Sequence, residues 1–455
     1  MKKVTRTISG ITPVAVMAQP MGCPGQCVYC PTYPATPQSY TPESPAVLRA
    51  RECGYDARRQ VEVRLKMLTE MGHPTDKVEL IVMGGTFPAA PEEYQSRFIQ
   101  ECYEALNRGL NGRPATGLEE AQHVNETAEH RVVGLCIETR PDYCSAEQVE
   151  WMLNFGTTRV EMGVQTLDDD VYRMVKRGHG VAEVVAATRR LKQHGLKVHY
   201  HWMPGLPGST PEHDLALSRT LFDDQRFRPD GLKIYPTMVV AGTELEKWYD
   251  DGRYQPYDRE TMTALVANIK SVVPKYVRIS RVLRDIPPKF IVGGLKDSLR
   301  ESVQKRMEAE GHACRCIRCR EYGHRLRAGQ SVSDPKLVRI DYEASRGREV
   351  FLSFEDDRET LFGMLRLRIQ EEGLRAIVRE LHVYGLEVPI GGRSKAGAQH
   401  QGFGRALLAE AERLARDEFA ADSLAVLSGV GAREYYAGLG YRRAGHYMVK
   451  ALLNR

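Results

Sequence analysis

The feature that most constrains the fold is an alternation of short apolar segments and amphipathic segments between residues 75 and 285. Stretches with helical periodicity, such as 92–109, 145–156 and 181–195, the last ending in Gly195 as a predicted helix C-cap, separate the apolar ones. This alternation predicts a parallel sheet covered by helices. The segments expected to form strands are 77–85, 131–140, 157–166, 195–205, 230–237 and 275–283, with 11–20 as a possible first strand.

Six or seven strand–helix units favour a full or partial (β/α) barrel over a doubly wound sheet. The active site of such a barrel lies at the carboxyl ends of its strands. Polar or glycine-rich residues follow the strands at 23–30, 84–87, 138–142, 164–166 and 203–208. We therefore expect these residues to share one face of the barrel.

The pattern changes near residue 349, where paired strands precede a glycine-rich loop and a long amphipathic helix at 399–419. We expect three parts: a barrel over 1–285, a connector over 286–348, and a smaller α/β domain over 349–455. The connector region is basic, because residues 271–348 hold 18 Lys and Arg against 9 Asp and Glu, whereas the whole chain carries only +5. Such a patch favours phosphate binding over a solvated surface of paired charges.

The chain has 455 residues and no segment of about 18 uncharged apolar residues that would cross a membrane. Its first 20 residues make a poor signal peptide. These features predict a cytoplasmic protein without membrane contact. Ten cysteines in such a chain do not indicate a disulfide framework, but two groups of three, at 23–30 and 314–319, are candidates for metal binding.

Cys23, Cys27 and Cys30 have the spacing C-x3-C-x2-C. Structural zinc usually takes four ligands, and a redox motif needs only one C-x-x-C. Three thiolates on one loop can instead hold three irons of a 4Fe-4S cluster and leave the fourth iron open to chelate S-adenosylmethionine. This interpretation is favoured over zinc, and the arrangement is the signature of radical S-adenosylmethionine enzymes.

Residues at the ends of later strands could bind S-adenosylmethionine. Gly84 and Gly85, followed by Thr86, would allow close backbone approach to its methionine amino group. Glu138 and Gln165 are candidates for its ribose or amino group. A salt bridge between Glu138 and Arg140 is an equally good alternative.

The glycine-rich loop fits Q-x-x-G-x-G at the start of a helix, where backbone N–H groups can bind the pyrophosphate of acetyl-CoA. The order of strand, loop, helix and "YYAGLGY" resembles the GNAT acetyltransferases. Tyr435 and Tyr436 fall where that family keeps a general acid, and we expect one of them to be catalytic and the other to pack in the core. Glu380 could act as a base, although buried pairing is equally plausible. The loop residues expected to bind acetyl-CoA are Gln399, His400, Gln401, Gly402, Phe403, Gly404 and Arg405.

Cys314, Cys316 and Cys319 form C-x-C-x2-C in the connector. We interpret them as a structural zinc site, with His312 or His324 as a possible fourth ligand. Nearby arginines would face outward and bind the phosphates of RNA. These are Arg315, Arg318, Arg320 and Arg325.

The combination resembles the catalytic subunit of Elongator, in its prokaryotic type. The blocks "CVYCP", "MGGTF", "IETRPDYC", "DGLKIYPT", "RDIP", "QHQGFG" and "SGVGAREYYAGLGY" carry this resemblance, which covers essentially the whole chain. The gap between the first two cluster cysteines is shorter than in eukaryotic relatives, and the basic N-terminal extension common in the family is missing. Both departures favour a free-standing enzyme that does not require accessory subunits.

The resemblance implies a tRNA-modifying transferase that carboxymethylates carbon 5 of the wobble uridine. A 5′-deoxyadenosyl radical would abstract hydrogen from the acetyl methyl of acetyl-CoA, whose hydrolysis tRNA would stimulate. An electron donor would reduce the cluster, and the basic connector would hold the anticodon arm, with the target base splayed out of its stack. The alternatives are a protein-lysine acetyltransferase with a structural barrel and a non-catalytic tRNA-binding scaffold.

Overall fold

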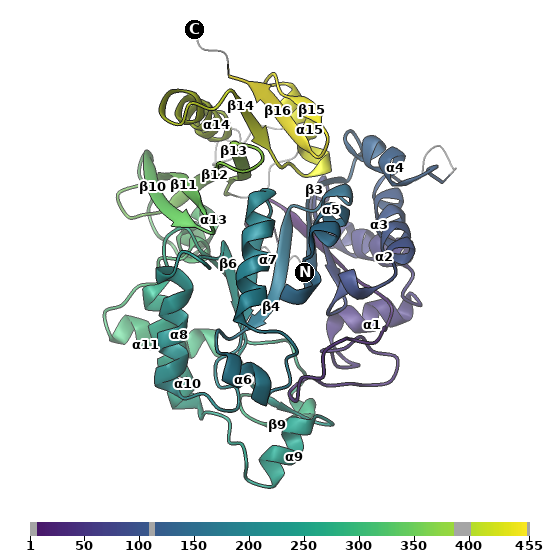
Figure 1. Ribbon diagram of the computed structural model, residues 1–455, viewed down its shortest axis with the longest axis vertical. Coiled ribbons are helices and arrows are strands. Elements are labelled where there is room, and N and C mark those ends of the chain that lie inside the picture. Colours follow the sequence, from purple (N-terminus) through teal and green to yellow (C-terminus); the bar gives the residue numbers. More distant parts are fainter. Residues whose placement is uncertain (1–6, 109–113, 386–401, 453–455) are drawn as a thin grey trace.

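The computed structural model describes residues 7–108, 114–385 and 402–452, which form two seven-stranded sheets (Figure 1). All neighbouring strands of the first sheet pair in parallel, in chain order. Within the described chain no backbone pairing joins the last strand to the first, so the barrel is partial. Its strands are β1 (Thr12–Met17), β2 (Lys77–Met83), β3 (Arg131–Thr139), β4 (Arg159–Gln165), β5 (Lys197–Trp202), β6 (Gly231–Ile234) and β8 (Arg278–Val282).

Helices cover the outer face of this sheet. Val78, Leu80 and Val82 of β2 point outward and are fully buried beneath them. Helix 181–193 ends before Gly195, whose φ of +82° fits the C-cap expected from the sequence. The helices are α1 (Pro45–Glu52), α2 (Ala57–Glu70), α3 (Glu92–Leu106), α4 (Leu118–Asn125), α5 (Ala146–Asn154), α6 (Asp169–Met174), α7 (Val181–Gln193), α8 (Pro211–Asp223), α9 (Glu244–Asp250) and α10 (Arg259–Val272).

The connecting region contains short elements packed on the barrel. Strands β7 (Val239–Val240) and β9 (Ile291–Gly293) form a separate antiparallel pair. Three helices follow: α11 (Arg300–Ala309), α12 (Ile317–Arg320) and α13 (Tyr322–Arg327). None of the described helices is long and apolar enough to span a membrane.

The second sheet lies across one end of the barrel (Figure 1). Its order is β10-β11-β12-β13-β14-β16-β15, and only β13 and β14 pair in parallel. They share two registered pairs, at 377–378 and 425–426, after which β13 continues to Val383 paired with β12 but no longer with β14. The elements are β10 (Lys336–Ala344), β11 (Gly347–Glu355), β12 (Leu361–Ile369), β13 (Ala376–Val383), α14 (Phe403–Arg413), β14 (Ser423–Val426), α15 (Arg433–Ala437), β15 (Arg442–Ala444) and β16 (Tyr447–Ala451).

Strand β10 falls in the range that we expected to be connector, so the second sheet begins earlier in the chain than the sequence pattern indicated. Its apolar positions Val338, Ile340 and Tyr342 alternate with polar ones, but they are only partly buried. Because most β10 side chains remain partly or fully exposed, this range resembles a connector more than the fully buried strands do.

A buried ionic network joins the two sheets. Asp230, just before β6, accepts hydrogen bonds from both terminal nitrogens of Arg379 on β13, at 2.6 and 2.9 Å. Lys192 and Arg366 also lie within 3.3 and 3.5 Å of the same carboxylate. Because charges taken out of water are stable only when paired, this network makes the position of one domain on the other specific.

Candidate active sites

Two cavities contain most of the residues singled out from the sequence. One, of about 680 Å³, lies at the carboxyl ends of the barrel strands, and we call it the carboxyl-end cavity. The other, of about 830 Å³, lies between the amino ends of these strands and the second sheet, and we call it the interdomain cavity. The two predicted chemistries therefore face opposite ends of the same half-barrel.

The cysteine loop after β1 lines the carboxyl-end cavity. The backbone N–H of Gly25 donates to Sγ of Cys23 at 3.4 Å, and the buried guanidinium of Arg177 donates to Sγ of Cys27 at 3.4 Å. Such donors stabilise the thiolate form that binds metal. Among the described residues, the three sulfurs of this loop do not all lie within 4.8 Å of one another, as the ligands of a single ion would. Thiolates that ligate separate irons of one cluster stand further apart. The geometry fits a cluster better than zinc.

Nη1 of Arg140 and Oε1 of Gln165, on the wall of this cavity, are among the buried polar atoms that have no hydrogen-bond partner in the described chain. Buried polar groups are nearly always satisfied, so atoms of this kind indicate where a polar ligand binds. A Cβ on Gly25 would lie only 1.9 Å from Nη1 of Arg140, which explains why glycine stands in the cysteine loop there. The cavity thus suits a cluster with a polar nucleoside ligand.

The other predicted residues of this site lie where the strand pattern placed them. Gly84 and Gly85 have φ of +143° and +81°, conformations that favour glycine, and Gly85 and Thr86 line the cavity. Gln165 ends β4 with φ of +73°, a rare conformation for a residue other than glycine and one that often marks a functional site.

Glu138 also lines the cavity, but its partner differs from the alternative considered above. Arg140 pairs with Asp142 at 2.8 Å, so the Glu138–Arg140 salt bridge was wrong. Glu138 instead accepts a hydrogen bond from Tyr40 at 2.5 Å and lies 3.5 Å from the ammonium of Lys233. This carboxylate is therefore held at the cavity wall by a phenol and a lysine from distant segments.

Sequence reasoning missed several polar residues of this cavity. Lys233 of β6 pairs with Glu161 of β4, which also accepts from His201 at 3.2 Å. Arg177 was missed as well, although "RGHG" at 177–180 follows a strand–helix unit and could have indicated a loop of the site. The strand residues offered no such signal, because alternation marks the inner face of a barrel without showing which polar side chains meet there.

The second predicted site lines the interdomain cavity. Gly402, with φ of +88°, precedes α14, and residues 402–405 face the cavity. Gln399, His400 and Gln401 lie outside the described residues. The phenol of Tyr435 lies at this loop, since a Cβ on Gly404 would be 3.1 Å from its oxygen. The diverging ends of β13 and β14 open onto the same cavity.

The two tyrosines differ as expected. Tyr435 is 42% exposed and keeps its hydroxyl near the loop, whereas Tyr436 is buried among the apolar residues under the second sheet. Burial raises the pKa of both phenols, so each is protonated at neutral pH and could donate but not accept a proton there. Both tyrosines line the cavity, and the greater exposure of Tyr435 favours it as the acid.

Glu380 is a correction. Its carboxylate is not free to accept a proton, because Arg366 donates a hydrogen bond to it at 2.8 Å and the ammonium of Lys197 lies 3.6 Å away. Burial opposes its ionisation, but these two cations hold its pKa well below the usual range. A general base needs a pKa near the working pH, so the structure supports the buried-pairing alternative for this residue.

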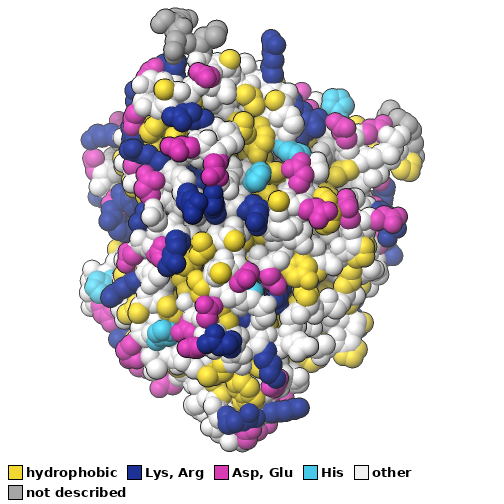
Figure 2. Space-filling view, viewed as in Figure 1, with side chains coloured by type: hydrophobic (Ala, Val, Ile, Leu, Met, Phe, Trp, Pro, Cys, Tyr) yellow, Lys and Arg dark blue, Asp and Glu magenta, His cyan; other side chains and the backbone are white. Residues whose placement is uncertain are grey.

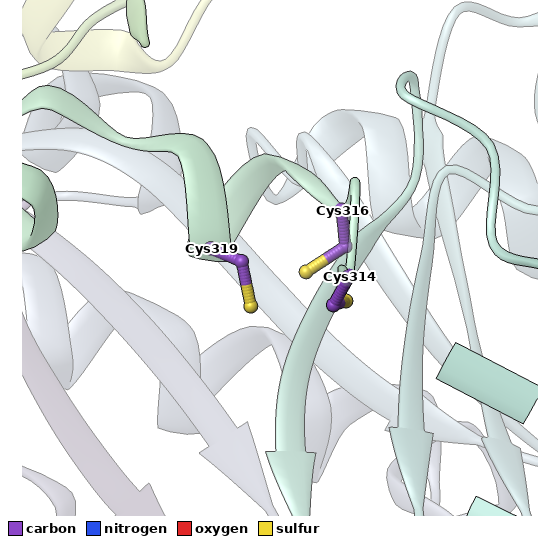
Figure 3. Close-up of side chains that lie close together, drawn as sticks. All are labelled: Cys314, Cys316 and Cys319. Carbon is purple, nitrogen blue, oxygen red and sulfur yellow. The ribbon is translucent and has the colours of Figure 1, made fainter. Parts of the chain in front are cut away.

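The connector cysteines converge in space. The sulfurs of Cys314, Cys316 and Cys319 all lie within 4.8 Å of one another, at the start of α12 (Figure 3). Neither His312 nor His324 belongs to this group; each instead lies near a glutamate, at 3.7 and 3.5 Å. Three thiols this close, two of them buried and one half-buried, match the ligand arrangement of a tetrahedral metal.

The arginines expected to bind RNA have different environments. Arg320 is a correction, because it is fully buried and bound to Glu355 at 2.9 Å. Arg315 is exposed but paired with Glu359, and Arg325 donates to Gln330. Arg318 is half-buried and faces both cavities. Figure 2 shows acidic and basic side chains interspersed over the visible face, so the positive excess of the connector does not form one uniform patch there.

Comparisons with known proteins agree with this architecture. Residues 20–220 match the radical SAM superfamily, 229–309 a radical SAM C-terminal domain, and 315–441 the acetyltransferase (GNAT) family. A "tRNA uridine(34) acetyltransferase" of Dehalococcoides mccartyi is 63% identical over 99% of this chain and all of that protein. "Elongator complex protein 3" of Homo sapiens is 44% identical over 99% of this chain and 86% of that protein.

A solved structure of archaeal Methanocaldococcus infernus Elp3 with an N-terminal deletion has a TM-score of 0.86 to this chain at 45% identity. It covers 98% of this chain and all of that one. Fold and order of domains thus agree with the relatives along the whole length. The chain belongs to the radical SAM and GNAT family of the tRNA uridine(34) acetyltransferases and Elongator complex protein 3.

Proposed function

We propose that this protein is an enzyme that modifies the wobble uridine of tRNA, adding at carbon 5 a carboxymethyl unit taken from acetyl-CoA. The observation that carries the proposal is the pairing of two complete cavities in one chain: a cysteine loop at one end of the half-barrel and a helix-start loop with Tyr435 at the other. The names of the relatives support tRNA as substrate.

At the carboxyl-end cavity, Cys23, Cys27 and Cys30 would hold a 4Fe-4S cluster. When bound, the cluster and S-adenosylmethionine supply one-electron chemistry that yields a radical able to take hydrogen from a methyl group. The chain orients and shields these groups: Arg177 donates to a ligand sulfur, and Gly85 and Gln165 present polar atoms to the cofactor.

At the interdomain cavity, the N–H groups of the loop before α14 would hold the pyrophosphate of acetyl-CoA. The gap between the diverging strands β13 and β14 gives its pantetheine arm a place to lie. Tyr435 would donate its proton to the sulfur of the departing thiolate.

The remaining parts of the proposal concern partners. Arg49, Arg281 and Arg284 line the carboxyl-end cavity and could bind the phosphates of the anticodon arm, with the target base turned into the cavity. A zinc ion bound by Cys314, Cys316 and Cys319 would stabilise the fold of the connector. An electron donor of the cytoplasm would reduce the cluster, and the enzyme would act without accessory subunits.

A protein-lysine acetyltransferase is the less favoured function, because Glu380, the base considered for it, is neutralised by two cations. The deciding experiment is an anaerobic reaction of reconstituted enzyme with unmodified tRNA, reductant, S-adenosylmethionine and acetyl-CoA, followed by mass spectrometry of the nucleosides. Carboxymethyluridine at the wobble position is expected. Unmodified uridine together with acetylated protein would refute the proposal.

A further inference from the structure

The inner face of the half-barrel is open, unlike the filled interior of a closed (β/α) barrel. On β2 the outward side chains are fully buried, whereas the inward ones, at positions 77, 79, 81 and 83, are all partly exposed. Other side chains of the inner face are also partly exposed: Lys233 keeps 14% and Arg159 keeps 13% of its side-chain surface exposed. Solvent therefore reaches the interior along the strands.

The two cavities meet inside this lumen. Five residues line both of them, and we call these the shared layer: Pro13, Glu79, Arg159, Arg278 and Arg318. The layer between the two cavities is only one side chain thick, because the same five residues border both. From Glu79 in the shared layer to Met83 beside the cysteine loop, β2 rises about 13 Å, at roughly 3.3 Å per residue.

Most cations of the shared layer are already neutralised. Arg159 pairs with Glu79 and lies 3.4 Å from Glu161, and Arg278 pairs with Glu321. Arg318 differs, because no hydrogen bond or ion pair to its guanidinium is found among the described residues, although it is half-buried.

We propose that the half-barrel lumen conducts the two-carbon acyl unit from the interdomain cavity to the cysteine loop, and that Arg318 binds its oxygen on the way. The acyl unit could arrive as the thioester on the extended pantetheine arm or as released acetate; both present an oxygen acceptor to a guanidinium. This inference rests on the proposed function, because it connects the two sites which that function requires.

The geometry favours a small acyl unit over RNA as the occupant. The shared layer lies between the two cavities, in the interior of the molecule, and its free hydrogen-bonding group is a single guanidinium. A polynucleotide needs a row of accessible cations, whereas the shared layer offers one guanidinium without a partner among the described residues, and nearby Arg315 is paired with Glu359.

The first test blocks the lumen. Pro13→Phe places an aromatic ring in the shared layer, and Gly134→Leu is the second blocking variant, since a Cβ there meets nothing closer than 3.4 Å. The matched control, Val63→Phe, adds the same ring on the exposed surface of α2. Three rates are measured: tRNA-stimulated acetyl-CoA hydrolysis, reductive cleavage of S-adenosylmethionine, and formation of modified uridine.

We expect a blocking variant to keep both half-reactions near the rates of the unsubstituted enzyme and to lose modified uridine about 100-fold, a cost typical of misplaced reactants. If a blocking variant keeps both half-reactions and still forms modified uridine at the rate of the control variant, the proposed passage of the acyl unit through the lumen is refuted. If the unsubstituted enzyme makes no modified uridine, the proposed function fails instead, so the two failures are distinguishable.

The second test removes the guanidinium. Arg318→Gln should lower formation of modified uridine about tenfold, the effect of one lost charged hydrogen bond, while tRNA affinity and its salt dependence stay unchanged. Arg315→Gln is the control on the outer surface. Weaker tRNA binding with a shallower salt slope for Arg318→Gln would show instead that this arginine contacts phosphate, and would overturn its assignment to the acyl unit.

Labelled substrates separate the two forms of the acyl unit. Trideuterated acetyl-CoA and its non-hydrolysable carbon analogue are compared for deuterium transfer to 5′-deoxyadenosine. Transfer from both supports the extended arm, and transfer from the thioester alone supports released acetate. Transfer from neither, in enzyme that cleaves both cofactors, would refute the passage.

Discussion

Replacing Asp230 by asparagine tests whether the ionic network holds the two domains together. The carboxylate accepts hydrogen bonds from two nitrogens of Arg379, from Lys192 and from the backbone N–H of Val198. Asparagine keeps the shape but removes the charge, and its amide nitrogen faces groups that are themselves donors. Buried cations then lose their main counter-charge.

The expected loss is about 3–5 kcal/mol in the free energy of unfolding, the usual effect of breaking a buried ion pair from one side. Charged hydrogen bonds contribute about 1.5–3 kcal/mol each, so the full set would give more if the contributions were additive, which shared partners prevent. The loss is a large part of a total stability of about 5–15 kcal/mol.

Urea unfolding followed by far-UV circular dichroism and by tryptophan fluorescence measures this effect, and two probes show whether the domains separate first. Asp341→Asn is the matched control, because Asp341 pairs with Arg339 and Arg348 at the surface and its charge is screened. The control should lose no more than about 1 kcal/mol. Equal losses in the two variants would refute the reasoning.

The same carboxylate makes a pH prediction. Burial opposes its ionisation, but Arg379, Lys192 and Arg366 hold the pKa of Asp230 well below its unfolded value. Its contribution to stability is therefore fully present above the unfolded pKa of about 3.9 and is lost as pH falls toward the folded pKa. The stability difference between Asp230→Asn and the unsubstituted protein should shrink below pH 4, and a constant difference would contradict this.

Three further predictions concern the sites. Cys27→Ala should abolish iron binding and uridine modification while acetyl-CoA binding persists by calorimetry; retained modification would exclude cluster chemistry. The Cys316→Ser variant should contain about one zinc fewer per chain by metal analysis, and an unchanged zinc content would refute the proposed zinc site. Tyr435→Phe should slow acetyl-CoA hydrolysis about 100-fold, whereas Tyr436→Phe should mainly lower stability; the reverse order would exchange their roles.

Much of the fold was predictable because its signals are local. All seven barrel strands lie within the segments expected from the sequence, since each buries apolar side chains on its outer face against helices. Strand β10 was not predicted, although Val338, Ile340 and Tyr342 alternate with polar residues there. Its side chains stay largely exposed, and it joins the sheet through its pairing with β11.

Parts of the sites could not be predicted for a similar reason. The candidate residues on loops and strand ends were found from spacing, but the partners of Glu138, Glu380 and Arg320 were not, because they come from strands and helices far away in the chain. A charged residue in a sequence does not show whether tertiary packing will pair it or leave it free.

The sequence by itself determined the chemistry that each loop can support, since cysteine spacing, glycine positions and strand–helix alternation act over a few residues. Only the tertiary structure decided that the barrel stays open and that the two cavities border the same five side chains. It also decided that Arg320 is buried and paired, whereas Arg318 has no ion-pair partner in the part of the chain that the structure describes. The physical reason is that burial and ion pairing depend on which distant segments meet, and that is set by packing of the whole chain.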